Sequence, residues 1–374
     1  MTDRTDHPDG TAPRTVLFTI QHPAHVHFFK HAIWALEDDG HDVHVVARDN
    51  EVAVDLLDSY DIEHSVLANE SGSLAQLAFV QAAYELRTIY YAYRVDADVV
   101  VGVGGVTAAH TAAVVGAESV VFTDTEHATL INKLTHPVAD YVVTPSCYTE
   151  DAGDSQVTYP SYHELAYLHP DRFTPDPSVF EDMQVDPDEK FVVVRLSAWD
   201  SSHDVGASGL KDVTDAVERL EATGATVLIT SEVPLPDALE RCRTDVAPEA
   251  MHHLLAYANL FISEGATMAS ECAVLGTPAI YVNSLTMGYT DELEARYDLL
   301  THYPEEDEQD AALEHAVSIL DDHDAGAWER RRQQLLADKQ DTTGVILRML
   351  ALAMNDDELV SDDVLDATKV LADT

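Results

Sequence analysis

The fold is decided by residues 260–282, which read LFISEGATMASECAVLGTPAIYV. The stretch opens on a short apolar run, which predicts a buried strand. Gly265 predicts a turn after that strand, and the small residues from Thr267 onward predict a helix that ends at Gly276. A second apolar run, residues 279–282, predicts the next strand. A strand, a helix and a strand in this order indicate a βαβ unit with parallel strands.

The same unit occurs 160 positions earlier in the chain. Residues 98–103 and 119–122 predict its two strands, and the small residues between them predict its helix. The glycines and several helix residues coincide at this offset. The matching pairs are Gly105 and Gly265, Thr107 and Thr267, Ala113 and Ala273, Val114 and Val274, and Gly116 and Gly276. The repeat predicts two α/β domains of related topology.

Further strands and a proline-rich stretch set the domain boundaries. An opening strand, helix and strand are predicted at residues 16–20, 28–38 and 41–47, and the second domain is predicted to begin its sheet at residues 191–196. Five prolines between residues 159 and 188 indicate a linker. We expect a flexible N-terminus at 1–14, a Rossmann-like domain at 15–160, a linker at 161–188, a second Rossmann-like domain at 189–340 and C-terminal helices at 341–374.

The C-terminal third reads as helical, with helices predicted at residues 311–320, 327–339, 343–353 and 360–371. We expect the C-terminal helices of residues 341–374 to cross back onto the first domain. The predicted fold class is therefore α/β, with two Rossmann-type domains facing a cleft.

Acidic residues dominate the composition, with 68 Asp and Glu against 21 Lys and Arg and a formal net charge of −47. At molar salt the Debye length is about 3 Å, so the repulsion among these charges is largely screened. Carboxylates spread along the whole chain are typical of a halophilic archaeal cytoplasm, so we expect a cytoplasmic, high-salt location. Nucleic acid is excluded as a partner because its binding needs basic patches.

The cysteines and the apolar runs exclude other classes. Cys147, Cys242 and Cys272 are far apart and odd in number, which supports neither a disulfide framework nor a thiolate zinc site. Residues 1–13 lack the basic and apolar segments of a signal peptide. No apolar run approaches the roughly 20 residues that span a bilayer.

The turn at Gly265 is the sharpest candidate site. A glycine between a strand and a helix lets backbone N–H groups approach an anion, and the helix N-terminus favours phosphate. Glu271 lies four residues past Thr267, one turn along the same face, where its carboxylate could accept from ribose hydroxyls. The alternative is a tight turn with a solvated glutamate.

Histidines follow the first predicted strand, in the run His22-Pro23-Ala24-His25-Val26-His27. Ligands of open α/β sheets bind beyond the carboxyl ends of strands, so we expect this loop to face the cleft. His25 is a candidate general base, with His22 and His27 as substrate-binding neighbours. A metal site using His27 and His31 is the less favoured alternative, and helix capping or packing is another.

Polar residues also follow the strand predicted at 119–122, in the order Asp124, Thr125, Glu126 and His127. We expect Asp124 and Glu126 to act as acid or base groups and His127 to bind substrate. The alternative is a solvated loop in which Asp or Thr caps a helix.

The second domain's first strand ends in Arg195, with Ser197 and His203 beyond it. Arg195 and Ser197 are candidates for diphosphate binding, the arginine through paired charge-assisted hydrogen bonds. Gly104 and Gly105 follow the strand predicted at residues 98–103 and are expected opposite this segment. They either allow a sugar or acceptor to approach or serve tight helix–sheet packing.

The glycine motif, with Glu271 and the later Gly276-x-Pro278, resembles the donor-nucleotide motif of GT-B glycosyltransferases such as the N-acetylglucosaminyltransferase of peptidoglycan synthesis. That resemblance implies that Glu271 contacts ribose and that phosphate lies against four consecutive residues, Gly265, Ala266, Thr267 and Met268. It also implies a GT-B-like arrangement of the two domains, with the nucleotide in the second.

Several longer stretches resemble an archaeal family catalogued as domain of unknown function 354. They are residues 21–29 (QHPAHVHFF), 123–127 (TDTEH), 162–170 (YHELAYLHP) and 202–204 (SHD). That family is similar to non-hydrolysing UDP-N-acetylglucosamine 2-epimerases, in which a catalytic Glu follows the strand equivalent to 119–122.

The match to the epimerases is incomplete. Asn132-Lys133 stands where they carry an Asn-Arg pair, and the Pro-Glu-Glu before that pair is absent. His203 is matched to their His-Arg-x-Glu signature by the histidine alone, and it is a catalytic candidate on that basis.

These observations predict a nucleotide-sugar-dependent glycosyltransferase that uses a UDP-linked donor, needs no cofactor or metal, and transfers a sugar to an unknown acceptor. A membrane-borne lipid acceptor reached by peripheral contact stays among the candidate partners. The alternatives are a UDP-N-acetylglucosamine 2-epimerase-like enzyme with Glu126 and His203 as acid and base, and a non-catalytic nucleotide-sugar-binding protein.

Overall fold

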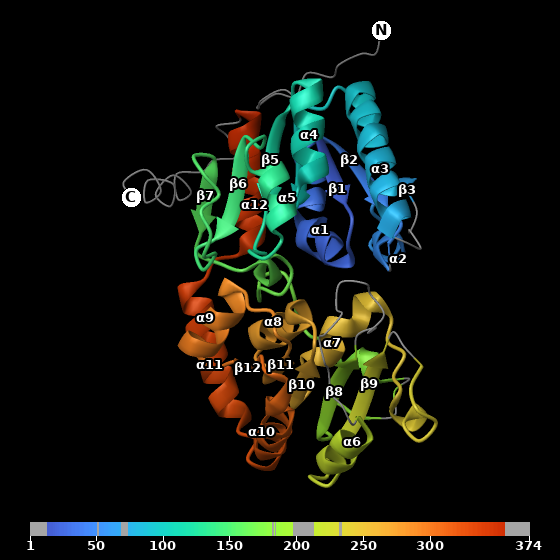
Figure 1. The fold of residues 1–374 in the computed structure, drawn as a ribbon, viewed down its shortest axis with the longest axis vertical. Coiled ribbons are helices and arrows are strands. Elements are labelled where there is room, and N and C mark those ends of the chain that lie inside the picture. Colours follow the sequence, from blue (N-terminus) through green and yellow to red (C-terminus); the bar gives the residue numbers. More distant parts are fainter. Residues whose placement is uncertain are drawn as a thin grey trace. The chain divides into compact units, whose positions relative to one another are not determined.

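The computed structural model describes residues 13–50, 52–68, 74–181, 183, 185–196, 213–231 and 234–355. They divide into two compact units (Figure 1). The first unit runs to Tyr167 and resumes at Asp341, and the second runs from Leu168 to Gln340. Residues 161–167, which the sequence assigned to a linker, thus belong to the first unit.

The first unit is built on a seven-stranded sheet in the order β3-β2-β1-β4-β5-β6-β7, in which every pair of neighbours is parallel. The strand order reverses between β1 and β4, which makes their carboxyl ends the switch point of this sheet. Its strands are β1 (Thr15–Ile20), β2 (Asp42–Arg48), β3 (Ser65–Ala68), β4 (Val99–Val103), β5 (Glu118–Phe122), β6 (Tyr141–Pro145) and β7 (Gln156–Tyr159). Its helices are α1 (Pro23–Asp38), α2 (Ala53–Ser59), α3 (Leu74–Val95), α4 (Val106–Val115), α5 (Thr129–Thr135), the short 3₁₀ helix η1 (His163–Ala166) and α12 (Thr342–Met354).

Helix α1 begins five residues earlier than the sequence predicts. The reason is its N-cap: His22 has an extended backbone, and its Nδ1 accepts a hydrogen bond from the Ala24 N–H at 3.2 Å. Pro23 occupies the first helical position, where its missing N–H costs nothing. The histidines expected in a loop therefore lie at the N-cap and in the first turns of a helix.

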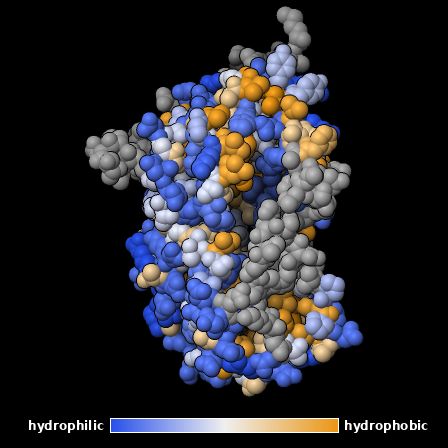
Figure 2. Space-filling view, in the orientation of Figure 1, coloured by the Kyte–Doolittle hydropathy of each residue, from blue (hydrophilic) through white to orange (hydrophobic). Residues whose placement is uncertain are grey.

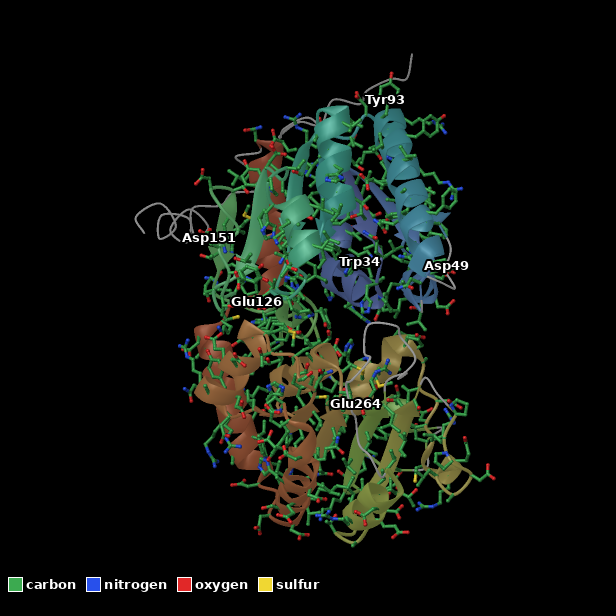
Figure 3. All side chains as sticks on the ribbon, in the orientation of Figure 1. Trp34, Asp49, Tyr93, Glu126, Asp151 and Glu264 are labelled. Carbon is green, nitrogen blue, oxygen red and sulfur yellow. The ribbon has the colours of Figure 1, made fainter. Side chains whose placement is uncertain are left out.

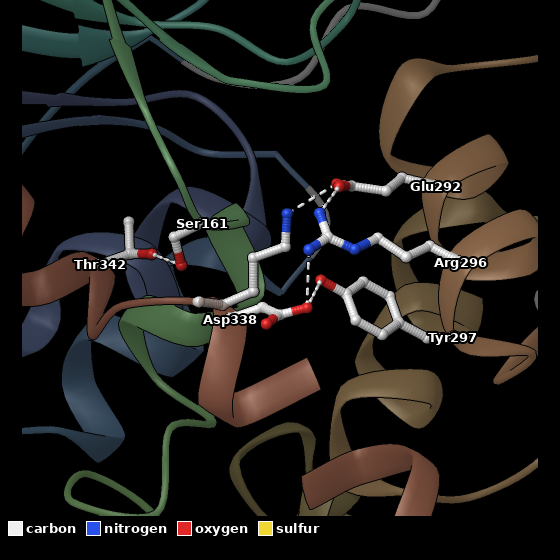
Figure 4. Close-up of polar contacts among 7 residues, drawn as sticks. Ser161, Glu292, Arg296, Tyr297, Asp338 and Thr342 are labelled. Atoms are coloured by element: carbon white, nitrogen blue, oxygen red, sulfur yellow. Dashed lines mark hydrogen bonds and ion pairs between the residues drawn. The ribbon is translucent and has the colours of Figure 1, made fainter. Parts of the chain in front are cut away.

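Helix α12 belongs to the first unit, although it follows the whole second unit in sequence. It packs against α1 and η1. The Thr342 hydroxyl lies 2.8 Å from Ser161 Oγ (Figure 4). It also donates to the Tyr162 carbonyl at 2.6 Å. The Thr343 hydroxyl donates to the Ala166 carbonyl at 2.6 Å. These buried bonds hold η1, and so His163, against the start of α12.

The second unit contains a five-stranded sheet in the order β12-β11-β10-β8-β9, again parallel throughout. Its switch point lies between β8 and β10. Its strands are β8 (Phe191–Leu196), β9 (Thr226–Ser231), β10 (Leu260–Ser263), β11 (Ala279–Val282) and β12 (Leu300–Tyr303). Its helices are η2 (Pro177–Phe180), α6 (Val213–Glu221), η3 (Glu240–Cys242), η4 (Pro248–Ala250), α7 (Met251–Leu255), α8 (Ala266–Leu275), α9 (Gly288–Tyr297), η5 (Glu306–Glu308), α10 (Gln309–Asp321) and α11 (Ala325–Asp338).

A charged cluster ties the end of α11 to α9 (Figure 4). Lys339 Nζ lies 2.6 Å from Glu292 Oε2, and the lysine side chain is 2% exposed. Arg296 donates to both Glu292, at 3.2 Å, and Asp338, at 2.7 Å. The Tyr297 hydroxyl donates to the same Asp338 oxygen at 3.1 Å. The cluster fixes the last helix of the unit before the chain leaves it.

The repeat detected in the sequence is present in three dimensions. Helices α4 and α8 span equivalent residues, 106–115 and 266–275, and each ends at a glycine in the left-handed region, Gly116 and Gly276. The buried strands β4 and β10 precede them, and β5 and β11 follow. The C-terminal helices also lie close to the ranges expected, except that residues 360–371 are outside the described part of the chain.

Most of the surface in view is hydrophilic, with apolar side chains gathered over α4 and α5 (Figure 2). The exposed apolar residues there include Val114, Leu130 and Leu134. Within the described residues, none of the helices combines the length and the apolar character needed to cross a bilayer.

Candidate functional site

In the second unit, Gly265 lies between β10 and α8, next to the switch point of the sheet. Its backbone is extended, with φ −100° and ψ 124°, which any residue adopts. A Cβ atom built on Gly265 would meet one neighbour within 4 Å, Ser263 Oγ, at the ordinary contact distance of 3.5 Å. Among the residues that the structure describes, neither backbone conformation nor packing therefore requires glycine here, and they leave open space beside it.

The equivalent glycines of the first unit differ. Gly104 and Gly105 have φ of +67° and +50°, so both occupy the left-handed region that disfavours other residues. A Cβ on Gly105 would lie 2.4 Å from Val121 Cγ1 of β5. Packing and backbone conformation thus explain the first unit's glycines.

Within the described part of the chain, the first turn of α8 has no side-chain cap on its backbone N–H groups. Gly265 provides no side-chain cap, and the first turn carries no acidic residue. Thr267 is exposed, and Ala266 and Met268 are partly exposed. The Gly265 N–H itself donates to Ser263 Oγ at 2.8 Å, which fixes the turn. An uncapped helix N-terminus beside open space suits a phosphate group.

Arg195 is next to this turn in the sheet. It is the register partner of Ser263 across the β8–β10 ladder, and its side chain is partly buried. Ser197 and His203, the other candidates from this segment, lie outside the described residues.

Glu271 lies one turn into α8 and is buried, 4% exposed. Its Oε1 lies 3.0 Å from Nε2 of His252 on α7. Glu264, labelled in Figure 3, is also buried, and its carbonyl accepts from Asn283 Nδ2 at 2.8 Å. Buried polar residues that are held by an ion pair or a hydrogen bond therefore lie near the turn at Gly265.

In the first unit, the three histidines of the β1–α1 segment have different surroundings. His22 is exposed and caps α1. His27 is buried, with its Nδ1 3.3 Å from the Tyr60 hydroxyl and its ring stacked on Tyr167 at 5.3 Å. The structure thus places His27 in the packing between α1, α2 and η1, and leaves His25 at the carboxyl end of β1.

His25 is partly buried, and its Nδ1 accepts from the Gln21 N–H at 3.4 Å. Burial lowers the pKa of His25 to about 3, with a further reduction from His22 and His163 that Asp124 opposes. The imidazole is therefore neutral over the physiological pH range.

Asp124 follows β5 and is paired with a histidine that the sequence analysis did not select. His163 Nδ1 lies 3.1 Å from Asp124 Oδ2, and the two side chains are 11% and 16% exposed. Burial alone would raise the pKa of Asp124, but the charge and hydrogen bond of His163 and the hydrogen bond from Thr125 lower it below its ordinary value. In the sequence, His163 lies in the predicted linker. The family resemblance of residues 162–170 includes it but assigns it no role.

Glu126 lies beyond the carboxyl end of β5 (Figure 3). Its Oε1 accepts from the Thr149 N–H at 3.2 Å and lies 3.4 Å from the Thr149 hydroxyl. Asn132 Nδ2 donates to the Thr125 carbonyl and to the Tyr148 hydroxyl, both at 3.2 Å, and this holds the same loop. His127 is exposed. Glu126 thus connects the loops after β5 and β6.

The structure gathers His25, Asp124 and His163 at the carboxyl edge of the first sheet, and Arg195, Gly265 and the start of α8 at the carboxyl edge of the second. Across the described ranges, no three His, Cys, Asp or Glu side chains are grouped as a metal site would require.

Residues 15–347 match the family described as "Protein of unknown function (DUF354)". The chain belongs to this family. Among curated proteins, none matches the sequence of this DUF354 member.

Solved structures similar to this DUF354 protein include enzymes that act on nucleotide-sugars. The UDP-N-acetylglucosamine 2-epimerase of Rickettsia bellii has a TM-score of 0.67 and 12% identity, over 92% of this chain and 98% of its own. The UDP-GlcNAc 2-epimerase of Methanocaldococcus jannaschii, in complex with UDP-GlcNAc and UDP, has a TM-score of 0.59 and 13% identity, over 86% and 99%. The glycosyltransferase VinC, in complex with dTDP, has a TM-score of 0.60 and 16% identity, over 91% and 99%.

These similarities establish the fold. The α/β class with two parallel-sheet, Rossmann-like domains, which the sequence predicts, is confirmed, and the structural neighbours include GT-B glycosyltransferases. Sequence identities of this size show the architecture alone, so the chemistry must be argued from the residues.

Proposed function

We propose that this protein is a nucleotide-sugar-dependent glycosyltransferase whose second unit binds the donor's diphosphate at Gly265 and the first turn of α8. The observation that carries the proposal is the open space at Gly265. Within the described residues neither φ nor packing requires glycine there, and a glycine lets a ligand approach the backbone closely.

The surrounding residues suit a diphosphate leaving group. The uncapped N–H groups of Ala266, Thr267 and Met268 provide donors and the positive end of the helix dipole. Arg195, beside Ser263, supplies the positive charge that stabilises the diphosphate as its bond to the sugar breaks. The ribose is assigned to the part of the site near Glu271. Structural neighbours in complex with dTDP, or with UDP-GlcNAc and UDP, support a nucleotide as the ligand of this fold.

The first unit supplies acid–base groups in this proposal. His25, Asp124 and Glu126 are partly buried at the carboxyl edge of its sheet and held by hydrogen bonds. A protein that only bound nucleotide-sugars would not need a buried carboxylate–histidine pair at that edge, which favours an enzyme over a non-catalytic binder.

Epimerisation of the sugar is the second candidate, favoured by the presence of several ionisable groups in one unit and by the epimerases among the structural neighbours. The two reactions are distinguished by incubating the protein with UDP-N-acetylglucosamine in molar KCl made up in D₂O. Transfer, to an added acceptor or to water, releases UDP. Epimerisation at C2 releases none and places deuterium on the sugar, which mass spectrometry detects. Deuterium incorporation without UDP would overturn the transferase assignment.

A further inference from the structure

We propose that His163 is the general base of this enzyme and that Asp124 positions it. His25 is a neutral hydrogen-bond donor to the substrate. Both assignments rest on the glycosyltransferase function proposed above. The sequence pointed instead to His25 or Glu126 as the base. The reassignment follows from which ring nitrogen of each histidine is already engaged.

The Asp124 carboxylate fixes the tautomer of His163. Asp124, whose pKa lies below its ordinary value of 3.8, is ionised near neutral pH and can only accept a hydrogen bond. His163 Nδ1, 3.1 Å away, must therefore carry the proton. In the neutral ring this leaves the lone pair on Nε2, the atom a general base uses.

His163 Nε2 is buried, and within the described residues it has no hydrogen-bond partner. Buried polar atoms are almost always bonded, so this ring nitrogen is open to a hydrogen bond with a group of a ligand or with a water molecule. The ring packs beside Phe28 at 4.4 Å between centroids, and η1 is held by the Thr342 and Thr343 bonds described above. His163 is therefore rigidly placed before any substrate binds.

His25 has the opposite tautomer. Its Nδ1 accepts from the Gln21 N–H, so in the neutral ring the proton is on Nε2. A ring whose pKa is lowered to about 3, chiefly by burial, is a poor proton acceptor at neutral pH. Such a ring donates a hydrogen bond to an oxygen on which negative charge develops.

Glu126 is assigned to holding the loop after β6, because its Oε1 accepts from the Thr149 N–H. Other ionisable groups around His163 are Tyr159 on β7, Cys147 after β6 and Glu164 on η1. Burial raises the pKa of Tyr159 well above its usual value, and Asp124, Cys147 and Glu164 raise it further, so it stays a neutral phenol. Tyr159 therefore does not compete with His163 Nε2 for the role.

In the proposed step the acceptor hydroxyl gives its proton to His163 Nε2, and its oxygen forms a bond to the anomeric carbon of the sugar. The bond between that carbon and the diphosphate oxygen breaks, and the electron pair leaves with the diphosphate. The Asp124 carboxylate stabilises the imidazolium that forms, and the Nε2–H of His25 donates to an oxygen of the reacting sugar or acceptor.

The first test needs no knowledge of the substrate. In ¹⁵N-labelled protein in molar KCl, imidazole NMR spectra, assigned with the His163→Gln and His25→Gln variants, report the tautomer of each ring. We expect the proton on Nδ1 of His163 and on Nε2 of His25. The reverse tautomer at either ring would overturn that part of the proposal.

The second test compares UDP release from UDP-N-acetylglucosamine, with water as acceptor, against calorimetric UDP binding. We expect His163→Gln and Asp124→Asn to lower kcat 100-fold or more with UDP binding unchanged, and His163→Gln to remove the loss of kcat at acid pH. His25→Gln should lower kcat but keep that pH dependence. The control is His110→Gln. It breaks another carboxylate–histidine pair of the same unit, in which His110 on α4 lies 2.7 Å from Glu85 on α3.

A wild-type kcat in His163→Gln, with UDP still bound, would overturn the assignment of the base and leave the proposed function intact. Failure of the wild-type protein to bind any nucleotide would instead overturn the proposed function, while the tautomers would still be measured.

Discussion

His252 Nε2 and Glu271 Oε1 lie 3.0 Å apart, and each side chain is 6% exposed. The residue expected to bind ribose is therefore also a structural partner of α7. Removing the carboxylate takes from a buried ring its acceptor, which typically costs about 1–3 kcal/mol. We expect Glu271→Ala to lower the free energy of unfolding by about that amount, and Glu271→Gln, which keeps an acceptor oxygen, to lower it less. Urea denaturation in molar KCl measures both.

The same pair determines how ribose binding should be tested. Because Glu271→Ala disturbs α7 as well as the carboxylate, Glu271→Gln is the informative variant for nucleotide affinity. We expect it to weaken UDP binding about tenfold or more, or about 1.4 kcal/mol, and His252→Gln to weaken it less. If wild type and Glu271→Gln bound UDP with equal affinity, the carboxylate would not be part of the UDP-binding site.

His25 makes the fold sensitive to acid. Above its ordinary pKa of 6.5 the ring is neutral in both the folded and the unfolded chain and contributes no pH dependence. Below 6.5 the unfolded chain gains a proton that folded His25, with its pKa lowered chiefly by burial to about 3, does not take up. Stability therefore falls as pH decreases from 6.5 towards 3.

The matched variant is His25→Gln, which cannot titrate. We expect it to reduce the slope of unfolding free energy between pH 6.5 and 4.5 by up to about 1.4 kcal/mol per pH unit. A residual slope is expected from His136 and His323, whose pKa values burial also lowers. Parallel pH profiles for wild type and variant would show that His25 titrates normally.

In the charged cluster at the end of α11, we expect substitutions of Glu292 and of Lys339 to lower the free energy of unfolding by different amounts. Glu292 contacts both Lys339 and Arg296, whereas Lys339 is the nearly fully buried member. Lys339→Met keeps the Glu292–Arg296 contact and replaces a buried ammonium with an apolar chain of similar length. Glu292→Gln removes the negative charge from both cations. We expect Glu292→Gln to be the more destabilising, by about 1–3 kcal/mol, in thermal or urea unfolding. The opposite order would mean that the ammonium, not the carboxylate, organises the cluster.

The repeat shows how much of the fold can be predicted from the sequence. The 160-residue offset places α4 and α8 correctly, because glycine and small residues at fixed positions determine where such helices begin and end. The offset cannot show why each glycine is present. Glycine is required at position 105 by its positive φ and by the close packing of Val121. Neither a positive φ nor such packing among the described residues is found at Gly265, and this difference is visible only in the three-dimensional structure.

The candidate site was predicted in part. Strand order brings together the ends of β1 and β5, so His25 and Asp124 could be selected from their places after apolar runs. His163 could not, because it sits in a proline-rich stretch whose return to the sheet depends on buried bonds to Thr342 and Thr343, nearly 180 residues later. Similarly, the burial of His27 depends on Tyr60 and Tyr167, which no local pattern connects to it.

The open space at Gly265 gives the most direct test. Calorimetric titration in molar KCl would compare UDP, UDP-N-acetylglucosamine and GDP on the wild type, Gly265→Ala and Gly344→Ala. Gly344 also has room for a Cβ, but it lies in α12 of the first unit, where alanine should stabilise the helix by about 0.5–1 kcal/mol. We predict that a nucleoside diphosphate binds the wild type and Gly344→Ala equally, and that Gly265→Ala folds normally but binds at least about tenfold more weakly. Nucleotide binding that is absent from the wild type, or unchanged in Gly265→Ala, would contradict the account.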